Sequence, residues 1–332
     1  MIGPVPLDAK CSTSNDTLFL PAVITPLPLA SSSLAAPCSE GGSILIAVCS
    51  CRHYHAKRQV LRETWMKNLP PGTRAVFFVG EGIDEVEDDV FVVEGAPDDY
   101  EHLPAKVRAF FGRSLVDPEI GAFDWLFKCD DDTYVAAGRL IELTCLGYEH
   151  VGDAEFMPYR RAASGGAGYL LSRRLVEVLA ASDGLPNVGP EDVILSGEAV
   201  EICEGRCLAT RRLSHHARCY PRWDNNLVTA HWLSEKRMRA VHTLCSGPPW
   251  HVMTIRNVNW QDQVGFYEDG TFLRLSCDDY GLWDLEEDGT MELRWFDHAW
   301  ESVKVHSGAK GPGHGTTAKA DLEEPDLLIN VQ

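Results

Sequence analysis

Short apolar runs alternate with amphipathic segments from residue 43 to about residue 181. Such runs are typical of strands buried on both faces, and the segments between them have the period of helices. The expected strands are SILIAVCS (43–50), AVFFVG (75–80), DVFVVEG (89–95), FDWLFKC (123–129) and GYLLS (168–172). The expected helices are 56–68, 103–115, 136–146 and 173–181. This alternation predicts an α/β fold with a mostly parallel sheet and helices on both faces, which binds ligands at the carboxyl ends of its strands.

The pattern changes after residue 247, where ten aromatic residues crowd between Trp250 and Trp300. EDGTFLRL (268–275) and EDGTMELRW (287–295) each contain Asp-Gly beside strand-forming residues, which predicts two hairpins. Residues 248–305 are therefore expected to form a small antiparallel β module whose aromatic residues make its core or, alternatively, stack on sugars. Residues 306–332 are rich in Gly, Pro and charge, so a disordered tail is expected.

The first 42 residues resemble neither a spanning helix nor a good signal peptide. Residues 17–36 are apolar, but Pro21, Pro26 and Pro28 interrupt them, and proline disfavours a helix interior. We interpret residues 1–42 as a flexible stem, a degraded signal or a truncated start. No membrane anchor is evident in them.

Composition narrows the class of protein. The 332 residues are 45% hydrophobic and 24% charged, as in a soluble globular protein, and the net charge of −19 argues against a nucleic-acid partner. Residues 206–239 are locally basic, which suits a small anionic substrate or only a solvated surface. The eleven cysteines lack the spacing of a zinc site, and they leave both disulfide pairing and compartment open.

Three consecutive carboxylates, Asp130, Asp131 and Asp132, directly follow the expected strand 123–129. Like charges this close raise one another's pKa unless a cation lies between them. A divalent metal with oxygen ligands removes that cost and leaves positions open for phosphate oxygens. An N-terminal helix cap would explain one aspartate, but it does not need three.

Four ordered motifs resemble those of β1,3-galactosyltransferases, β1,3-N-acetylglucosaminyltransferases and Fringe-type enzymes. They are RQVLRETW (58–65), FKCDDDTYV (127–135), GGAGYLLS (165–172) and EDVILSG (191–197). NNLVTAHWLSEKRM (225–238) further resembles the galactosyltransferases that act on proteoglycan linker sugars. The resemblance implies a GT-A fold over residues 43–247, a UDP-sugar donor, Mn²⁺ and inversion at the anomeric carbon. It also implies a glycan or glycoprotein acceptor and the lumen of the Golgi or secretory pathway.

The resemblance also assigns the metal and donor residues. Asp132 would bind the metal, Asp130 would lie nearer the ribose, and Asp131 would lie between them. By this resemblance His231 corresponds to the family's metal-binding histidine, and imidazole with carboxylate suits Mn²⁺. The neighbouring pair His215 and His216 offers an alternative ligand.

Asp192 in EDVILSG corresponds to the family's catalytic base. An acceptor hydroxyl is a weak nucleophile that must lose its proton as it attacks, so a carboxylate on the acceptor side is chemically required. Because Asp192 follows Gly189 and Pro190, it is alternatively an acidic residue in the first turn of a helix.

Further donor contacts are expected from glycines and arginines. Gly165, Gly166 and Gly168 would let the backbone approach the donor sugar, or they form a tight turn. Arg58 and Arg62 lie four residues apart on one helix face, where they would attract diphosphate or only solvate that face. A second hypothesis, from another class of protein, is an inactive glycan-binding or scaffolding protein.

Overall fold

The computed structural model describes most of the chain between residues 42 and 331. The described ranges are 42–82, 87–203, 205–215, 227–247, 249, 251–256, 261–276, 279–285, 291–296, 302–307, 317–321 and 327–331. The expected stem, except for residue 42, lies outside these ranges, as do His216, Trp250, Trp260 and Trp300. No helix within the described ranges is long and apolar enough to cross a membrane.

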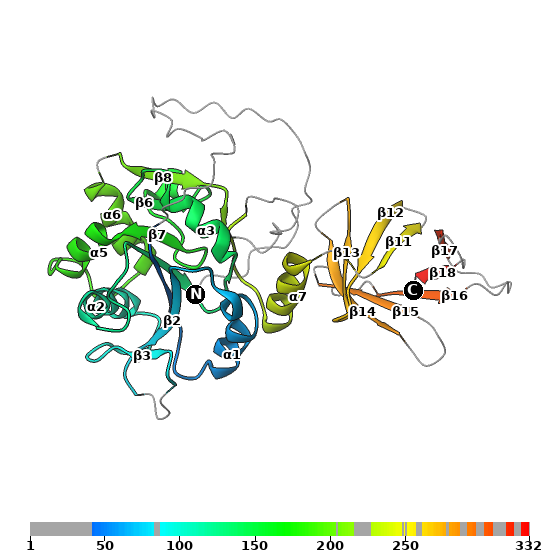
Figure 1. The fold of residues 1–332 in the computed structure, drawn as a ribbon, viewed down its shortest axis with the longest axis horizontal. Coiled ribbons are helices and arrows are strands. Elements are labelled where there is room, and N and C mark those ends of the chain that lie inside the picture. The colour runs from blue at the N-terminus through cyan, green and yellow to red at the C-terminus, as the bar shows by residue number, and fades with distance from the viewer. Residues whose placement is uncertain are drawn as a thin grey trace, which may run out of the picture.

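The larger body, which runs from β1 to α7, has a seven-stranded sheet at its centre (Figure 1). The strand order of this sheet is β3-β2-β1-β4-β7-β6-β8. Its strands are β1 Ile44–Cys49, β2 Thr73–Val79, β3 Val90–Val92, β4 Trp125–Asp130, β6 His150–Asp153, β7 Tyr169–Ser172 and β8 Cys207–Thr210. The strands β3, β2, β1 and β4 run parallel, whereas β7 is antiparallel to both β4 and β6. The predicted mostly parallel sheet is thus confirmed, and it contains one reversed strand.

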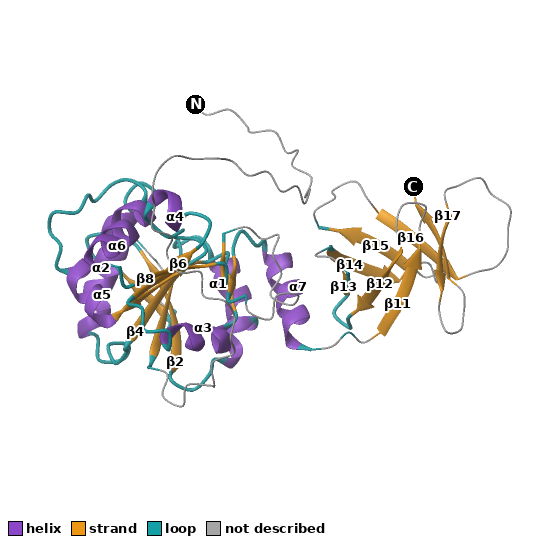
Figure 2. Ribbon diagram, turned by 90° about the horizontal axis from the view of Figure 1, so that it is seen from above, coloured by secondary structure: helices purple, strands orange, loops and turns teal. Residues whose placement is uncertain are grey.

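Helices cover both faces of this sheet (Figure 2). Successive side chains of β1 point alternately to the two faces, and both sets are buried. Ile44, Ile46 and Val48 point into a core with α1, α3 and α7, while Leu45 and Ala47 point into a core with α2, α5 and α6. The helices are α1 His55–Glu63, α2 Leu103–Val116, α3 Ala137–Thr144, α4 Met157–Arg160, α5 Arg173–Ala180, α6 Gly197–Ile202 and α7 Glu235–Ser246, with the short 3-10 turn η1 Trp65–Asn68 after α1. All four helices expected from the sequence are present.

The carboxy-terminal strands form a second, antiparallel sheet that closes on itself. Its strand order is β11-β12-β13-β14-β15-β16-β18-β17, and β17 pairs with β11. The strands are β11 His251–Arg256, β12 Gln261–Phe266, β13 Thr271–Arg274, β14 Tyr280–Leu285, β15 Met291–Trp295, β16 Ser302–Ser307, β17 Thr317–Asp321 and β18 Leu327–Val331. Both expected hairpins are present, as the pairs β12–β13 and β14–β15.

Two features of this barrel test the predictions for residues 248–332. Phe266, Phe272 and Trp295 are buried together in its own core, so these aromatic residues do not form an exposed sugar platform. The expected disordered tail is wrong at β17 and β18, which are strands of the barrel. Backbone pairing with β11 and β16 recruits them, although TAKAD in β17 has no apolar run.

The barrel packs on the larger body through α7. Tyr267, Leu273 and Tyr280 of the barrel belong to the same buried cluster as Leu244 of α7. The guanidinium of Arg237 lies 6.0 Å from the centre of the Tyr280 ring. The apolar core of the larger body therefore continues into the barrel.

This continuity predicts that the chain does not tolerate truncation after Gly247. Removing the barrel exposes the apolar face of α7, so we expect a loss of about 2–4 kcal/mol of stability and aggregation on heating. Thermal denaturation and light scattering of the truncated and full chains measure this. An unchanged melting temperature with unchanged UDP binding would show that the barrel is an accessory.

Candidate active site

The three aspartates lie at the carboxyl edge of the sheet, where β1 and β4 end side by side. Cys49 of β1 is in register with Asp130 of β4. The short strand β5 Tyr134–Val135 follows and pairs with β10 Thr229–Ala230, which itself lies parallel to β9 Leu213–Ser214. Because β10 ends at Ala230, this pairing brings the next residue, His231, back to the aspartates.

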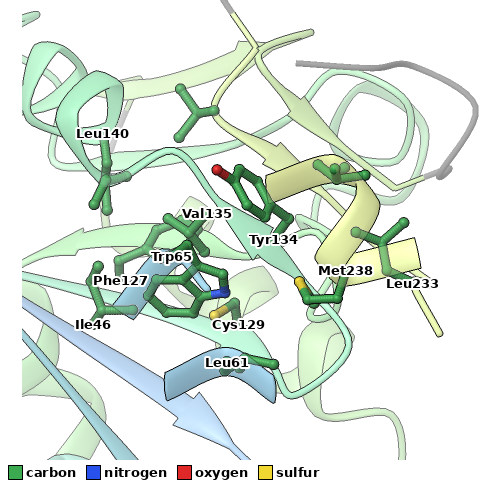
Figure 3. Close-up of a cluster of buried hydrophobic side chains, with 14 of the residues drawn as sticks. Ile46, Leu61, Trp65, Phe127, Cys129, Tyr134, Val135, Leu140, Leu233 and Met238 are labelled. Carbon is green, nitrogen blue, oxygen red and sulfur yellow. The ribbon is translucent and has the colours of Figure 1, made fainter. Parts of the chain in front are cut away.

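The buried Trp65 of RQVLRETW is hydrogen-bonded to the loop that carries the aspartates. Its indole Nε1 donates a hydrogen bond to the carbonyl oxygen of Thr133 over 3.1 Å. Figure 3 shows the ring packed among Phe127, Cys129 and Val135. The first motif therefore positions the second motif, although nearly seventy residues separate them.

Asp130, Asp132 and His231 form a cluster whose potential ligand atoms all lie within 4.8 Å of one another. The Nδ1 of His231 lies 3.2 Å from the carbonyl oxygen of His215. A carbonyl oxygen only accepts hydrogen bonds, so Nδ1 carries a proton, and in the neutral imidazole Nε2 then presents a lone pair.

That lone pair faces a carboxylate oxygen that has no donor. His231 Nε2 lies 3.2 Å from Asp132 Oδ1, and this buried oxygen has no hydrogen-bond partner among the described residues. Either a cation bound by both atoms or a proton on Nε2, which makes the contact an ion pair, satisfies these two buried atoms. Mixed nitrogen and oxygen ligands, with the ring oriented through its other nitrogen, fit a divalent transition metal such as Mn²⁺.

Asp131 turns away from this cluster, unlike its expected place in the donor site. Its carboxylate accepts a hydrogen bond from Ser50 Oγ at 2.8 Å and pairs with Lys57 Nζ at 2.8 Å. Burial raises the pKa of Asp131, and Lys57 and Ser50 only partly offset this effect. Asp131 therefore ties the aspartate loop to β1 and α1.

Lys128 is a site residue that was not predicted from the sequence. Its side chain is fully buried and contacts Asp130 of the cluster. Its ammonium pairs with Asp130 Oδ1 at 2.8 Å and with Glu191 Oε2 at 3.0 Å, and it donates to the carbonyl of Gly165 at 3.1 Å. Tyr169 donates its hydroxyl proton to the other oxygen of Glu191. Burial alone would lower the pKa of Lys128, but the two carboxylates hold it well above its ordinary value.

The effect of Lys128 differs between its two partners. Burial would raise the pKa of Asp130, but the charge of Lys128 lowers it below the ordinary value. For Glu191, burial dominates and the pKa is raised. A lysine inside the apolar strand FDWLFKC was the available sequence signal, because lysine is rarely buried without a partner.

The glycines admit protein side chains into the site. A Cβ on Gly166 would lie 2.1 Å from the ring of His231, and one on Gly165 would lie 2.8 Å from Glu191 Oε2. Gly168 has a positive φ of 90°, which supports the alternative of a tight turn. The glycine loop thus lets His231 and Glu191 approach, whereas contact with a donor sugar stays a prediction.

Asp192 begins the π-helical turn η2 Asp192–Ser196 beside the glycine loop. The backbone amide of Gly165 donates to Asp192 Oδ2 at 3.4 Å, and that of Val193 donates to Oδ1 at 2.9 Å. Gly165 and Gly166 therefore connect Asp192 directly to the neighbourhood of His231. Asp192 does start a helical turn, so the two interpretations of it are compatible.

Arg58 and Arg62 are committed to protein carboxylates. Arg58 is fully buried, and its guanidinium pairs with Glu87 at 2.5 Å and donates to Ser50 Oγ. Arg62 contacts Glu87 and Asp89. The geometry favours a structural role over the expected diphosphate contact, because both arginines link α1 to carboxylates of the segment just before β3.

Some arginines of the locally basic segment 206–239 also form ion pairs with protein carboxylates. Arg206 lies 2.7 Å from Glu149, and Arg212 lies 2.6 Å from Glu142. These pairs favour the interpretation of this segment as a solvated surface. Arg218 and Arg222 lie outside the described residues.

The larger body is an α/β domain that carries a cluster of two aspartates and a histidine at the carboxyl edge of its sheet. Residues 39–154 match the family described as Fringe-like, which confirms the Fringe-type resemblance over that segment.

A comparison with solved structures matches part of this chain with several glycosyltransferases. The mannosyltransferase PcManGT from Pyrobaculum calidifontis, in complex with GDP-Man and Mn²⁺, is 14% identical with a TM-score of 0.36 over 52% of this chain and 55% of its own. GlyE of Streptococcus pneumoniae is 10% identical with a TM-score of 0.34 over 59% and 55%. The galactosyltransferase LgtC, with donor and acceptor sugar analogues, is 13% identical with a TM-score of 0.35 over 62% and 98%. The chain thus spans about half the length of the first two proteins.

The tautomer of His231 leads to a prediction about metal affinity. His231→Ala removes the lone pair that faces Asp132, so the Mn²⁺ concentration for half-maximal UDP release should rise about tenfold or more. His215→Ala is the matched control, because it keeps the backbone carbonyl that orients His231. Titrations of both variants with Mn²⁺ measure the effect. A larger shift in His215→Ala or His216→Ala than in His231→Ala would assign the ligand to that pair.

Proposed function

We propose that this chain is a metal-dependent inverting hexosyltransferase that moves galactose or N-acetylglucosamine from a UDP-sugar to a glycan hydroxyl in β1,3 linkage. The observation that carries the proposal is the cluster of Asp130, Asp132 and His231, in which the buried Asp132 Oδ1 lies 3.2 Å from His231 Nε2. A glycan-binding protein without activity has no need for such a pair beside a carboxylate such as Asp192.

Asp132 and His231, with Asp130 beside them, would hold Mn²⁺. When bound, the ion takes up the charge that develops on the diphosphate leaving group, so no protein acid is needed there. Lys128 keeps Asp130 ionised by lowering its pKa, which leaves this carboxylate ready to contribute.

Asp192 would act on the other substrate. As the acceptor oxygen attacks the anomeric carbon, Asp192 accepts the hydroxyl proton, and the bond between that carbon and the diphosphate oxygen breaks. Attack opposite the departing UDP inverts the configuration in one step. The hydrogen bonds from Gly165 and Val193 fix the carboxylate for this role.

The donor, acceptor and compartment rest on the motif resemblance. It favours a UDP-sugar donor, a glycan or glycoprotein acceptor and the lumen of the Golgi or secretory pathway. The LVTAHWLSEKRM segment favours galactose, because it resembles the galactosyltransferases of the proteoglycan linker.

A donor screen tests the function directly. UDP release from UDP-galactose, UDP-N-acetylglucosamine and UDP-glucose is measured with Mn²⁺ and again with excess chelator, with and without glycan acceptors. We expect one UDP-sugar to be turned over, only with metal. Binding of UDP-sugar without any release of UDP would instead support an inactive glycan-binding or scaffolding protein.

A further inference from the structure

Trp232, the residue after His231, has an unusual backbone conformation. Its φ is 63°, and Arg161 is the only other non-glycine residue with a positive φ in the described ranges. A bulky residue in this left-handed region is strained relative to ordinary backbone. Strain of this kind persists where the surrounding structure enforces it and is frequent at functional sites.

The neighbours of Trp232 explain how the conformation is enforced. His231 and Leu233 are both buried, and the amide of Leu233 donates to the carbonyl of Asp132 at 3.0 Å. In a regular strand, alternate residues would point to the same side and the residue between them to the other. His231, Trp232 and Leu233 follow this alternation, and the two buried side chains together with the hydrogen bond of Leu233 hold the backbone of Trp232 in place between them.

The indole itself is 56% exposed, although burying a tryptophan is strongly favourable. Its ring centre lies 5.5 Å from that of His231 and 4.9 Å from that of His215. The His215 ring in turn meets Phe156 edge-on at 4.3 Å. One side of the indole is therefore supported by an aromatic cluster, and more than half of its surface faces solvent beside the metal ligands.

The indole is linked to the residues that would meet an acceptor through the ring of His231. Gly166 lies against the His231 ring, and its neighbour Gly165 binds Asp192. Asp131, Ser50 and Lys57, which face β1 and α1, lie on the other side of the aspartate loop. Trp232 is thus connected to Asp192, the candidate base for an acceptor hydroxyl, through His231 and the glycine loop.

We propose that Trp232 is the platform on which a pyranose ring of the acceptor glycan packs. This inference rests on the proposed transferase function and adds a residue for acceptor recognition. Pyranose rings have an apolar C–H face, and exposed aromatic rings beside a few fixed polar groups are typical of ligand sites. A solvated indole next to a reaction centre gains from covering that face.

The test uses Trp232→Gly and Trp232→Phe, with Arg161→Gly as the matched control. Glycine tolerates the left-handed backbone, so Trp232→Gly should not lower the melting temperature. The probes are the methyl β-glycosides of galactose, N-acetylglucosamine and xylose, scored by their stimulation of UDP release. We expect Trp232→Gly to raise the acceptor KM about tenfold or more and Trp232→Phe to raise it less.

The donor KM and the acceptor-independent hydrolysis of UDP-sugar should stay the same in both variants. Arg161→Gly relieves the same backbone strain at the end of α4, so acceptor KM should not change in it. An unchanged acceptor KM in Trp232→Gly, or a change in donor KM instead, would overturn the proposal. Stimulation of the wild-type protein by none of the three glycosides would also count against a pyranose platform. Absence of any UDP release from the wild-type protein would instead refute the transferase function itself.

Discussion

Asp132→Asn should abolish Mn²⁺-dependent UDP release. Asparagine keeps the shape of the side chain, but it removes the negative charge that faces His231 Nε2 at 3.2 Å. Its amide NH₂ can also donate to that nitrogen, which closes the site without a cation. We expect turnover to fall to the background level and UDP affinity to lose its dependence on metal, measured by UDP-release assays and calorimetry with and without Mn²⁺.

Asp131→Asn is the matched control, one residue away in the same loop. Asp131 pairs with Lys57 and Ser50 and does not belong to the cluster. This variant should lose about 1–3 kcal/mol of stability, because a buried charged hydrogen bond is weakened. The Mn²⁺ concentration for half-maximal activity should stay close to that of the wild type. Normal metal-dependent turnover in Asp132→Asn would remove Asp132 from the metal site.

The elements of the larger body could be predicted where the local pattern agrees with the tertiary structure. The apolar runs at β1, β2 and β4 are buried on both faces, and this burial is what makes such runs recognisable. The strand β6 was missed, because His150 and Asp153 are polar and short strands of this kind are stabilised by their neighbours. β8 is equally short, and pairing with β6 defines it.

The strands β17 and β18 near the end of the chain were not predicted from the sequence, for a different reason. LLINV in β18 is a short apolar run that could have been identified as a strand, but the composition of the surrounding residues hid it. TAKAD in β17 has no strand pattern of its own. Its strand arises from pairing with β11 and β18, which no local property of the sequence encodes.

The chemical identity of the site could be predicted better than its geometry. Clustered carboxylates indicated a cation, and the structure brings Asp132 and His231 together as expected. The sequence did not show that Asp130 joins them while Asp131 turns away, because this depends on where Lys128 and Lys57 lie in the folded chain. Gly166 was assigned to the donor sugar, yet its missing side chain is needed for the His231 ring.

Asp192→Asn should lower transfer about 10²–10⁴-fold, the usual contribution of a positioned general base. Binding of Mn²⁺ and UDP-sugar should be nearly unchanged, because Asp192 lies outside the cluster of potential metal ligands. Asparagine cannot accept the acceptor's proton, but its side-chain oxygen can still accept a hydrogen bond from Gly165 or Val193. The stability cost should therefore be about 1 kcal/mol or less. Melting temperature, UDP-sugar affinity and transfer rate are measured on the same preparation.

Glu191→Gln, one residue earlier, is expected to lower the stability of the protein, whereas Asp192→Asn lowers the transfer rate. Glu191 is buried against Lys128 and Tyr169, so neutralising it leaves Lys128 with only Asp130 as a charged partner. Breaking a buried pair in this way costs about 3–5 kcal/mol, and the melting temperature should fall markedly. If Asp192 only starts a helical turn, Asp192→Asn will retain its transfer rate per folded molecule while binding stays intact. That result would exclude Asp192 as the base, whereas a large loss of transfer at an unchanged melting temperature separates catalysis from folding.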